Sequence, residues 1–599
     1  MRQQRIQGAR IEEEGWGWAA ALPKQPAANA STKVEAAGIT DSIHLTLTIC
    51  HRDYTHTHTT RRKVQQSNAP SSKTAPLAFL WLLVCLVLHH TTCSSAAPTH
   101  PPPLSPHTTA ATMAGEEEVV RETSMYEHPL VKRYATKEMS YIWSPEKKFS
   151  TWRRLWIALA KAEKELGIDI TDEQIAQMEA HVMDIDFERA EKKEKETRHD
   201  VMAHVYTYGE AAPAAQGIIH MGATSCFVGD NTDIVQLKEG MELLQRKLVK
   251  LLAQMKTFAV EQRAHATLGF THYQAAQLTT VGKRMTLYMQ DFLIDLEHLE
   301  REIAALPMRG LKGTTGTQAT FLELFEGDHE KVKECNRKVC EYMGFDKWVA
   351  VSGQTYTRKI DYHILSVLSG VAQSAYKMCG DIRLLANLKE IEEPFGKDQI
   401  GSSAMAYKRN PMRSERVCSL ARYVMGLPAA AAQTHATQWF ERTLDDSSIR
   451  RIILPEAFLA VDVILNIVAN VTDGLQVWPQ VIRAHVMAEL PFMATEKILM
   501  ACCKKGGDRQ ALHHAIREHS MDAGRVVKAE GKPNDLLERI RLDPLFSVIH
   551  NELDELVDPM LFVGRAPEQV DEFMSEEIDP VLAKHKELLA VENKDGVSV

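Results

Sequence analysis

Apolar residues recur about every 3.6 positions along almost all of the chain from Thr151 onward, which predicts helices. A first helix carries its apolar stripe over Trp152–Ala162 and ends near Gly167, a residue suited to a helix C-terminus. Thr171 and Gln174 then have the spacing of a capping box, which predicts that the next helix begins there. Alternating runs typical of strands are few, so the sequence predicts an all-α body.

Three longer apolar patterns indicate a bundle of long helices. Two of them run from about Thr232 to Arg263 and from about Thr279 to Leu306. Helices of about 30 residues far exceed the usual length of about 11–12 and are typical of bundles and coiled coils. A third pattern, Pro455–Val471, is apolar on most faces and therefore needs burial on all sides, among helices of its own or neighbouring subunits. We therefore expect a central bundle in an oligomer.

The first 112 residues differ from this body. They hold nine of the 24 prolines, with Ser/Thr/His-rich runs and no sustained period, which predicts disorder. Their one apolar run, Ala75–Leu88, is shorter than the roughly 20 residues of a membrane span. It is similar to the apolar core of a signal peptide, but its distance from Met1 counts against that function. We favour Met113 as the working start and 1–112 as an alternative or artefactual extension.

Charge and cysteine content narrow the function classes. The net charge of -9 divides into +4 over residues 1–112 and -13 over the remainder. An acidic body argues against a nucleic-acid binder, so any anion site must be a local basic pocket. The 10 cysteines are scattered without the spacing of a disulfide framework, which is typical of reduced thiols. We expect a cytoplasmic protein that binds neither nucleic acid nor membrane.

Polar segments between the predicted helices are rich in groups that bind anions or move protons. They are Thr197–Val205, His220–Ser225, Gly269–Gln277 and Gly310–Thr317. The second is a Gly/Thr/Ser turn suited to a carboxylate or phosphate, and the fourth lacks the spacing of a nucleotide P-loop. His199 and His204 are five positions apart and cannot share one helix face, so no zinc site is predicted. A lone histidine such as His272 is more often structural, yet it lies at the mouth of the predicted bundle.

The stretch Gly401–Arg416 combines small hydroxyls with concentrated positive charge. Behind Gly401 it carries Ser402, Ser403, Lys408, Arg409, Arg413 and Arg416, with the single acid Glu415. This composition suits a polyanionic substrate whose reaction builds up negative charge, although a solvated basic loop has the same composition. The chain shows no G-x-S-x-G elbow, dinucleotide fingerprint or metal-ligand spacing. Acid/base chemistry by side chains, without metal or cofactor, therefore remains.

Within this stretch, GSSAMAYKRNP resembles the fumarase/aspartase superfamily signature G-S-S-x-M-P-x-K-x-N-P. Further segments resemble the adenylosuccinate lyase family of the animal type. They are RHDVMAHV (Arg198–Val205), GATSCFVGDNTD (Gly222–Asp233), TLGFTHYQAAQLTTVGKR (Thr267–Arg284) and QWFERTLDDSSIRR (Gln438–Arg451). The resemblance covers Met125 to about Leu589. It implies a three-domain fumarase/aspartase-type fold whose central bundle is completed in a homotetramer, with each active site built from three subunits.

We accordingly expect an extension at 1–112, an N-terminal helical domain at 113–224, a central bundle domain with the catalytic loop at 225–477, and a C-terminal helical domain at 478–599. The resemblance implies cofactor-free β-elimination of fumarate from adenylosuccinate and from succinyl-aminoimidazole-carboxamide ribotide. It implies no metal, and small-molecule nucleotides as substrates.

The resemblance also assigns roles to residues. Ser402 is the implied base, His272 the acid that protonates the leaving nitrogen, and Lys408 stabilises the carbanion, with Glu415 a weaker candidate for orienting the acid. A serine is a poor base at its ordinary pKa, so the loop must close over it. The implied substrate contacts are Arg133, Tyr134, Arg198, His199, Asp200, Thr224, Ser225, Gln354, Arg416, Arg442, Ser447 and Arg451.

The sequence departs from the family pattern at Ala406 and Ala275, which replace prolines. Loss of the proline constraint at Ala406 raises the entropy of the open loop, so we expect activity with weaker or slower loop closure. Two alternatives are another fumarate-releasing lyase, such as argininosuccinate lyase, and a catalytically silent crystallin-like protein. The Arg133–Tyr134 pair argues against the first, and joint retention of Ser402, His272 and Lys408 argues against the second.

Overall fold

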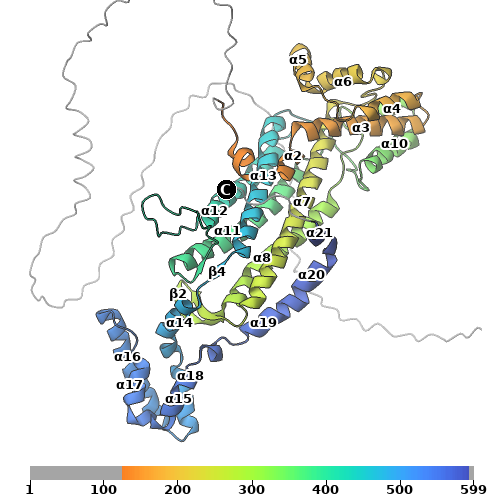
Figure 1. The fold of residues 1–599 in the computed structure, drawn as a ribbon. Helices are drawn as coiled ribbons and strands as arrows, with labels where there is room; N and C mark the ends of the chain where they lie inside the picture. Colours follow the sequence, from red (N-terminus) through yellow and green to blue (C-terminus); the bar gives the residue numbers. More distant parts are fainter. Residues whose placement is uncertain (1–124, 592–599) are drawn as a thin grey trace, which may run out of the picture. The chain divides into compact units, whose positions relative to one another are not determined.

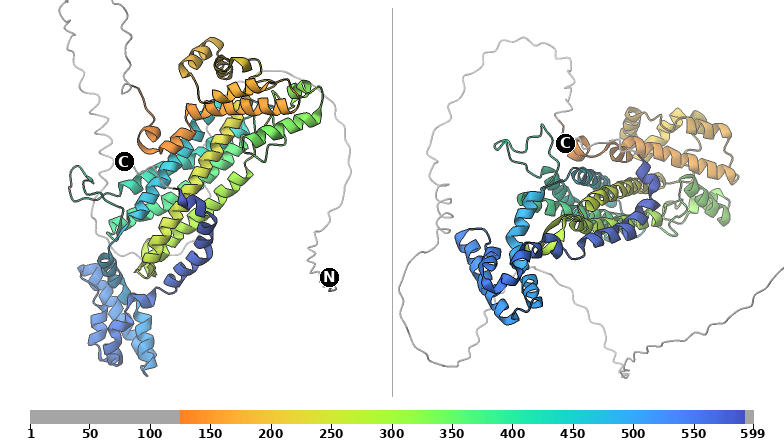
Figure 2. Two further views of the ribbon diagram at one scale, coloured as in Figure 1. Left: turned by 45° about the vertical axis from the view of Figure 1, so that its right-hand side comes forward. Right: turned by 60° about the horizontal axis from the view of Figure 1, so that its bottom comes forward.

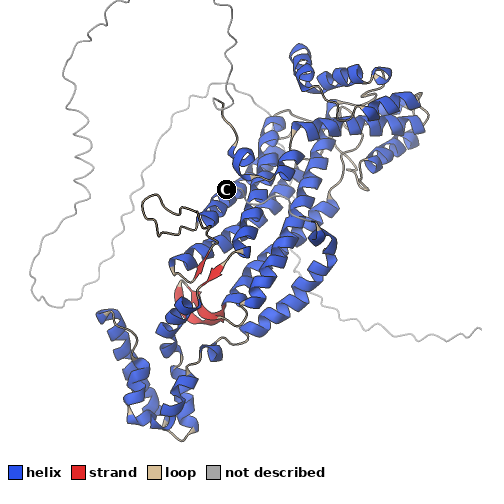
Figure 3. Ribbon diagram, viewed as in Figure 1, coloured by secondary structure: helices blue, strands red, loops and turns tan. Residues whose placement is uncertain are grey.

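The computed structural model describes residues 125–591, and helices make up most of their regular structure (Figure 3). The predictions for residues 1–112 therefore lie outside the described residues. The described residues all belong to one compact unit, and the description below concerns that unit. Its helical architecture confirms the predicted all-α class.

The N-terminal part contains short and medium helices whose ends are fixed by local side chains. The elements are η2 (Leu130–Tyr134), α2 (Lys137–Ile142), α3 (Pro145–Glu165), α4 (Asp172–Ala180), α5 (Phe187–Thr197), α6 (Asp200–Ala211) and η3 (Pro213–Ala215). Helix α3 begins after Ser144, whose hydroxyl accepts a hydrogen bond from the Lys147 N–H. The predicted capping box is confirmed, because the Thr171 hydroxyl and the Gln174 side chain each accept the other's backbone N–H.

Long helices form the central bundle (Figures 1 and 2). They are α7 (Ser225–Glu261), α8 (Val281–Ala305), α11 (Lys359–Asn387), α12 (Met412–Ala436) and α13 (Asp446–Asp473). Helix α7 packs against α8 and α13, while α11 packs against α8, α12 and α13. The two predicted long helices are confirmed, although α7 begins seven residues earlier than its predicted start at Thr232. The short helices α9 (Ala319–Leu324) and α10 (His329–Tyr342) lie between α8 and α11 in the chain.

Helix α13 is the apolar helix that the sequence predicted over Pro455–Val471. It is longer than predicted, with Pro455 in its interior. By length and composition alone it could cross a membrane, but 72% of its most apolar window is buried against the rest of the protein. Burial on nearly all faces explains its composition.

A β-hairpin joins α7 to α8, and the sequence analysis did not predict it. Strand β1 (Ala266–Thr271) pairs antiparallel with β2 (Gln274–Thr280). The two turn residues, His272 and Tyr273, both have positive φ, at 53° and 57°. Such backbone angles match a two-residue type I′ turn, which glycine and asparagine usually occupy. His272 is therefore presented at the tip of a rigid hairpin rather than in an irregular loop.

The C-terminal part consists of shorter helices that follow the small pairing of β3 (Ile391–Glu392) with β4 (Gln476–Val477). They are α14 (Pro479–Met493), α15 (Thr495–Lys504), α16 (Arg509–Glu530), α17 (Leu536–Leu542), η4 (Pro544–Glu552), α18 (Leu553–Leu556), η5 (Pro559–Phe562), α19 (Ala566–Phe573), η6 (Met574–Ile578), α20 (Asp579–Lys584) and α21 (Lys586–Ala590). The expected boundaries at 225 and 478 fall beside the starts of α7 and α14, and the division into three domains stays a prediction.

Candidate active site

A cavity of about 900 Å³ lies where α7 and α13 begin. Seven of the implied substrate-binding residues line it: Arg198, His199, Asp200, Ser225, Arg442, Ser447 and Arg451. Two more adjoin it, since Thr224 precedes the first residue of α7 and the Gln354 Oε1 accepts a hydrogen bond from Arg442 Nη1 at 2.9 Å. One chain thus gathers nine of the twelve predicted contacts in one place.

The turn between α5 and α6 delivers Arg198, His199 and Asp200 to the cavity. Arg198 ends α5 in the left-handed region, with φ 54°, which reverses the chain. His199 caps α6, because its Nδ1 accepts a hydrogen bond from the Met202 N–H at 3.3 Å. The prediction of a connecting segment through Val205 is wrong beyond His199, because α6 already starts at Asp200.

His204 illustrates this difference. It is buried inside the protein, with its ring stacked on Phe149 at 3.8 Å between centroids. Burial lowers the pKa of His204 to about 4, so the ring is neutral at physiological pH. We conclude that His204 supports the fold and takes no part in the cavity chemistry.

Several polar atoms at the cavity are buried without a hydrogen-bond partner among residues 125–591. They include Thr224 Oγ1, Arg442 Nε and Asp446 Oδ1. Buried polar groups are normally paired, because an unpaired one forfeits the bonds it made to water. Donors and acceptors that lack partners beside a large cavity are typical of a site that binds a polar ligand.

A buried ionic network holds the cavity walls together. Arg358, just before α11, contacts Asp230 on α7 at 3.1 Å and Asp446 on α13 at 2.7 Å. Arg450 on α13 similarly contacts Asp361 on α11 at 2.7 Å and Asp233 on α7 at 2.9 Å. Each arginine therefore links all three helices, which fixes the positions of the cavity-lining residues on α7 and α13.

The sequence analysis missed this network, although Asp230 and Asp233 are three residues apart and therefore on one face of α7. Nearby positive charge lowers the pKa of Asp230 despite its burial, with Arg358 as the main contributor. Burial instead raises the pKa of Asp233, and Arg450 only partly opposes it. Lys148 was also missed, although its side chain lines the cavity.

A second group of predicted contacts lies around Tyr134. The guanidinium carbons of Arg133 and Arg416 stand 5.6 and 5.1 Å from the centre of its ring. The next residues anchor this segment along α13, because the Thr136 N–H donates to Asp462 Oδ2 at 2.9 Å. The cavity lining on α13 reaches Pro455, so Asp462 lies seven residues beyond it, which corresponds to about 10 Å along the helix. Arg133, Tyr134 and Arg416 do not themselves line the cavity.

The loop before α12 carries Ser402 and Lys408. The Ser402 Oγ accepts hydrogen bonds from the N–H groups of Ala404 and Met405, at 3.3 and 3.1 Å. The Lys408 side chain is exposed. Glu415 follows in the first turn of α12, also exposed, beside a separate hollow of about 540 Å³. Within one chain, none of these groups lines the 900 Å³ cavity.

His272 is exposed at the hairpin tip, beyond the C-terminal end of α7. The cavity lies at the opposite end of this helix, and 37 residues span about 55 Å. The structure thus separates the predicted site residues of one chain into the cavity, the Tyr134 group, the loop before α12 and the hairpin tip.

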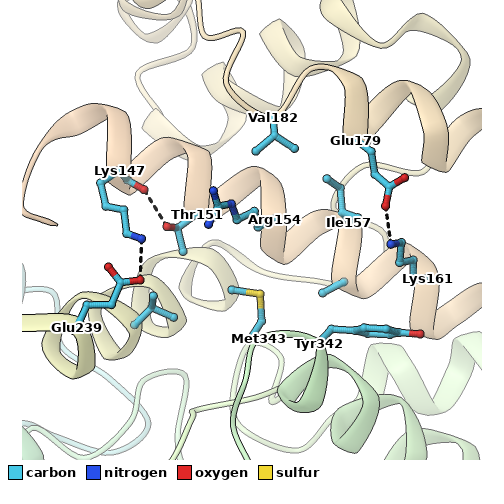
Figure 4. Close-up of a pocket in the computed structure, with 12 residues that line it drawn as sticks. Lys147, Thr151, Arg154, Ile157, Lys161, Glu179, Val182, Glu239, Tyr342 and Met343 are labelled. Carbon is cyan, nitrogen blue, oxygen red and sulfur yellow. Dashed lines mark hydrogen bonds and ion pairs between the residues drawn. The ribbon is translucent and has the colours of Figure 1, made fainter. Parts of the chain in front are cut away.

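A further hollow, of about 380 Å³, lies between α3, α4, α7 and α10 (Figure 4). It contains none of the predicted site residues. Two of its cations are already paired with carboxylates, Lys147 with Glu239 at 2.6 Å and Lys161 with Glu179 at 2.5 Å. Carboxylates of the hollow itself thus neutralise most of its positive charge.

Solved structures with this fold include a fumarate lyase from Mesorhizobium sp. BNC1, with a TM-score of 0.63, covering 74% of this chain and 99% of that one. The 3-carboxy-cis,cis-muconate lactonizing enzyme of Pseudomonas putida gives a TM-score of 0.64 and covers 76% and 98%. Both are 21% identical to this chain, a level that establishes the fold alone. A lyase family model also matches residues 133–426. The fold and this family model together define a helical protein of the lyase class.

Closer relatives narrow the family. A model of the adenylosuccinate lyase C-terminus matches residues 491–573. The adenylosuccinate lyases of Schizosaccharomyces pombe and Saccharomyces cerevisiae are 55% and 54% identical over 78% of this chain, covering 98% and 97% of those proteins. That of Schistosoma mansoni is 46% identical over 78% of this chain and 98% of its own length. The chain belongs to the adenylosuccinate lyase family.

Proposed function

We propose that this protein is an adenylosuccinate lyase, which cleaves adenylosuccinate to AMP and fumarate. It performs the same β-elimination on succinyl-aminoimidazole-carboxamide ribotide. The observation that carries the proposal is the 900 Å³ cavity, which gathers nine predicted substrate contacts in a member of this family. Both substrates combine a phosphate with two carboxylates, and the arginines and hydroxyls of the cavity suit such anions.

In the proposed mechanism, the Ser402 hydroxyl first gives up its own proton to solvent, and the resulting alkoxide removes the Cβ proton of the succinyl group. The carbanion delocalises into the adjacent carboxylate, and the Lys408 ammonium stabilises this added negative charge. The electron pair then forms the double bond of fumarate as the C–N bond breaks, and His272 protonates the leaving nitrogen. Glu415 is a candidate for orienting the acid.

The separation of these groups favours an active site assembled from several copies. No movement within one chain brings His272 across the length of α7 to the cavity, because the helix is a continuous rigid element. Copies packed side by side with opposite direction place the hairpin of one beside the cavity of another. We therefore include a homotetramer with shared sites in the proposal. The seven cysteines among the described residues form no disulfides, which suits a cytoplasmic location.

The activity is tested by measuring the change in absorbance after adenylosuccinate is added to the purified protein. Argininosuccinate is the control substrate. Turnover of argininosuccinate alone, or of neither compound, contradicts the proposal. Ser402→Ala should lower kcat by about 10²–10⁴-fold while AMP binding is retained.

Mixing tests the sharing of sites. Ser402→Ala and His272→Gln chains are each expected to be nearly inactive. After they exchange subunits, some assembled sites contain both intact residues and activity should return. If no activity returns although mixed assemblies are detected by mass, the two residues act within one chain and the proposed sharing is wrong.

A further inference from the structure

Lys148 is a cation in the cavity that lacks a partner. It belongs to the first turn of α3 and lines the cavity together with Arg198, His199 and Arg451. Among residues 125–591, no carboxylate lies within ion-pair distance of its ammonium group, and no hydrogen bond from that group is observed. An ammonium group that is taken out of water usually has a paired acceptor, because burying an unpaired charge is costly.

Aromatic rings take the place of the missing partner only in part. The Lys148 Nζ lies 5.3 Å from the centre of the Phe149 ring and 5.2 Å from that of Trp152. Ring faces attract a cation and hold its position, but they leave its three N–H donors without acceptors. Burial accordingly lowers the pKa of Lys148 below its ordinary value.

Asp233, Asp200 and Glu194 act on the Lys148 ammonium group only at a distance, so its N–H donors stay open to an incoming anion. Asp233 is already engaged by Arg450 at 2.9 Å, and Asp200 lies 3.7 Å from Arg451. The neighbouring Lys147 provides a contrast, since its ammonium points away from the cavity into the hollow of Figure 4, where Glu239 pairs with it at 2.6 Å. Of these two adjacent lysines on α3, Lys147 therefore has a carboxylate partner, whereas no carboxylate among the described residues pairs with Lys148.

We infer that Lys148 is a substrate-binding residue that donates charge-assisted hydrogen bonds to an anionic oxygen group of the nucleotide substrate, its phosphate or a succinyl carboxylate. This inference rests on the proposed function and adds a residue to it. The incoming anion supplies the acceptors that the ammonium lacks, and the aromatic platform orients the ammonium before binding. Because the group holds the substrate rather than reacting, its removal affects affinity more than the chemical step.

The experiment compares Lys148→Met, Lys148→Arg and Lys147→Met in the full-length assembly. Lys148→Met should raise KM for adenylosuccinate by about 10–100-fold, the usual effect of one charged hydrogen bond, with kcat changed less than about threefold. Lys148→Arg should restore most of the affinity. Lys147→Met should bind and react like the parent, although it loses the ion pair with Glu239.

Calorimetric titrations with AMP, inorganic phosphate and fumarate identify the anion. A loss in Lys148→Met confined to AMP and phosphate assigns the phosphate, and a loss confined to fumarate assigns a carboxylate. Equal affinities for all three compounds in Lys148→Met and Lys147→Met overturn the inference. If Lys148→Met does not fold, judged by circular dichroism, Lys148→Gln replaces it with the same expectations. A parent that binds AMP through Lys148 but does not cleave adenylosuccinate refutes the proposed function and leaves the inference standing.

Discussion

A buried carboxyl group on α3 should make the protein less stable as pH rises. The side chain of Glu163 is fully buried, and neither carboxylate oxygen has a hydrogen-bond partner within residues 125–591. Burial raises the pKa of this carboxyl group to about 9, from an ordinary value of 4.5. Glu163 is therefore protonated in the folded protein at neutral pH, whereas the unfolded chain carries it ionised.

The difference in proton binding fixes the sign and size of the effect. Between pH 4.5 and about 9 the folded state binds one proton more than the unfolded state, so stability falls with rising pH by up to about 1.4 kcal/mol per unit. At pH 7 the accumulated cost is about 3 kcal/mol, since 2.5 pH units separate pH 7 from the unfolded pKa. Below pH 4.5 both states are protonated and the cost vanishes.

Glu163→Gln keeps the shape of the side chain and cannot ionise. Its melting temperature, followed by differential scanning fluorimetry from pH 5 to 9, should fall less with pH than that of the parent. The slope is the informative quantity, because a buried amide has a desolvation cost of its own. Glu165→Gln is the control on the same helix, since Glu165 is exposed and paired with Lys338 and Tyr342. Parallel slopes for Glu163→Gln and the parent would refute the reasoning.

Two further predictions concern the network and the loop. Arg358→Met leaves the buried carboxylates of Asp230 and Asp446 without their ion-pair partner and should lower the free energy of unfolding by about 3–5 kcal/mol. Additional Asp230→Asn and Asp446→Asn changes should recover part of this loss. A denaturation curve identical to that of the parent would contradict this prediction. Ala406→Pro should favour loop closure by about 0.4–1 kcal/mol, seen as a two- to fivefold gain in kcat/KM, since no hydrogen bond from the Ala406 N–H is observed among the described residues. Equal kcat and KM in Ala406→Pro and the parent would remove the idea that this position limits closure.

The sequence predicted those elements whose formation depends on residues close together in the chain. The capping box at Thr171 and Gln174 is read within four residues, and the apolar composition of α13 already demands burial. The hairpin was missed because its strands are partly exposed and show no clean alternation of apolar and polar positions. Its turn also lacks glycine and asparagine, the residues that usually mark such a turn.

Resemblance supplied the individual predicted site residues, and the structure places most of the predicted substrate contacts at one cavity. The arginine network could not be predicted in the same way. Arg358 and its partners are separated by as many as 128 residues in sequence, so only the packing of α7 against α11 and α13 brings them together. Lys148 looked like any charged residue near a helix start, because its missing partner is a property of the folded cavity.

The continuous helix α7 also sets a dimension of the proposed assembly. Each residue of an α-helix advances it by 1.5 Å and turns it by about 100°. One inserted residue between Ser225 and Glu261 would thus swing the hairpin with His272 roughly a quarter turn around the helix axis. The same insertion in an exposed loop would be absorbed locally. Helix α7 therefore fixes the distance and the angle between the cavity and the hairpin. We expect its number of residues to vary less among related proteins than the lengths of the exposed loops.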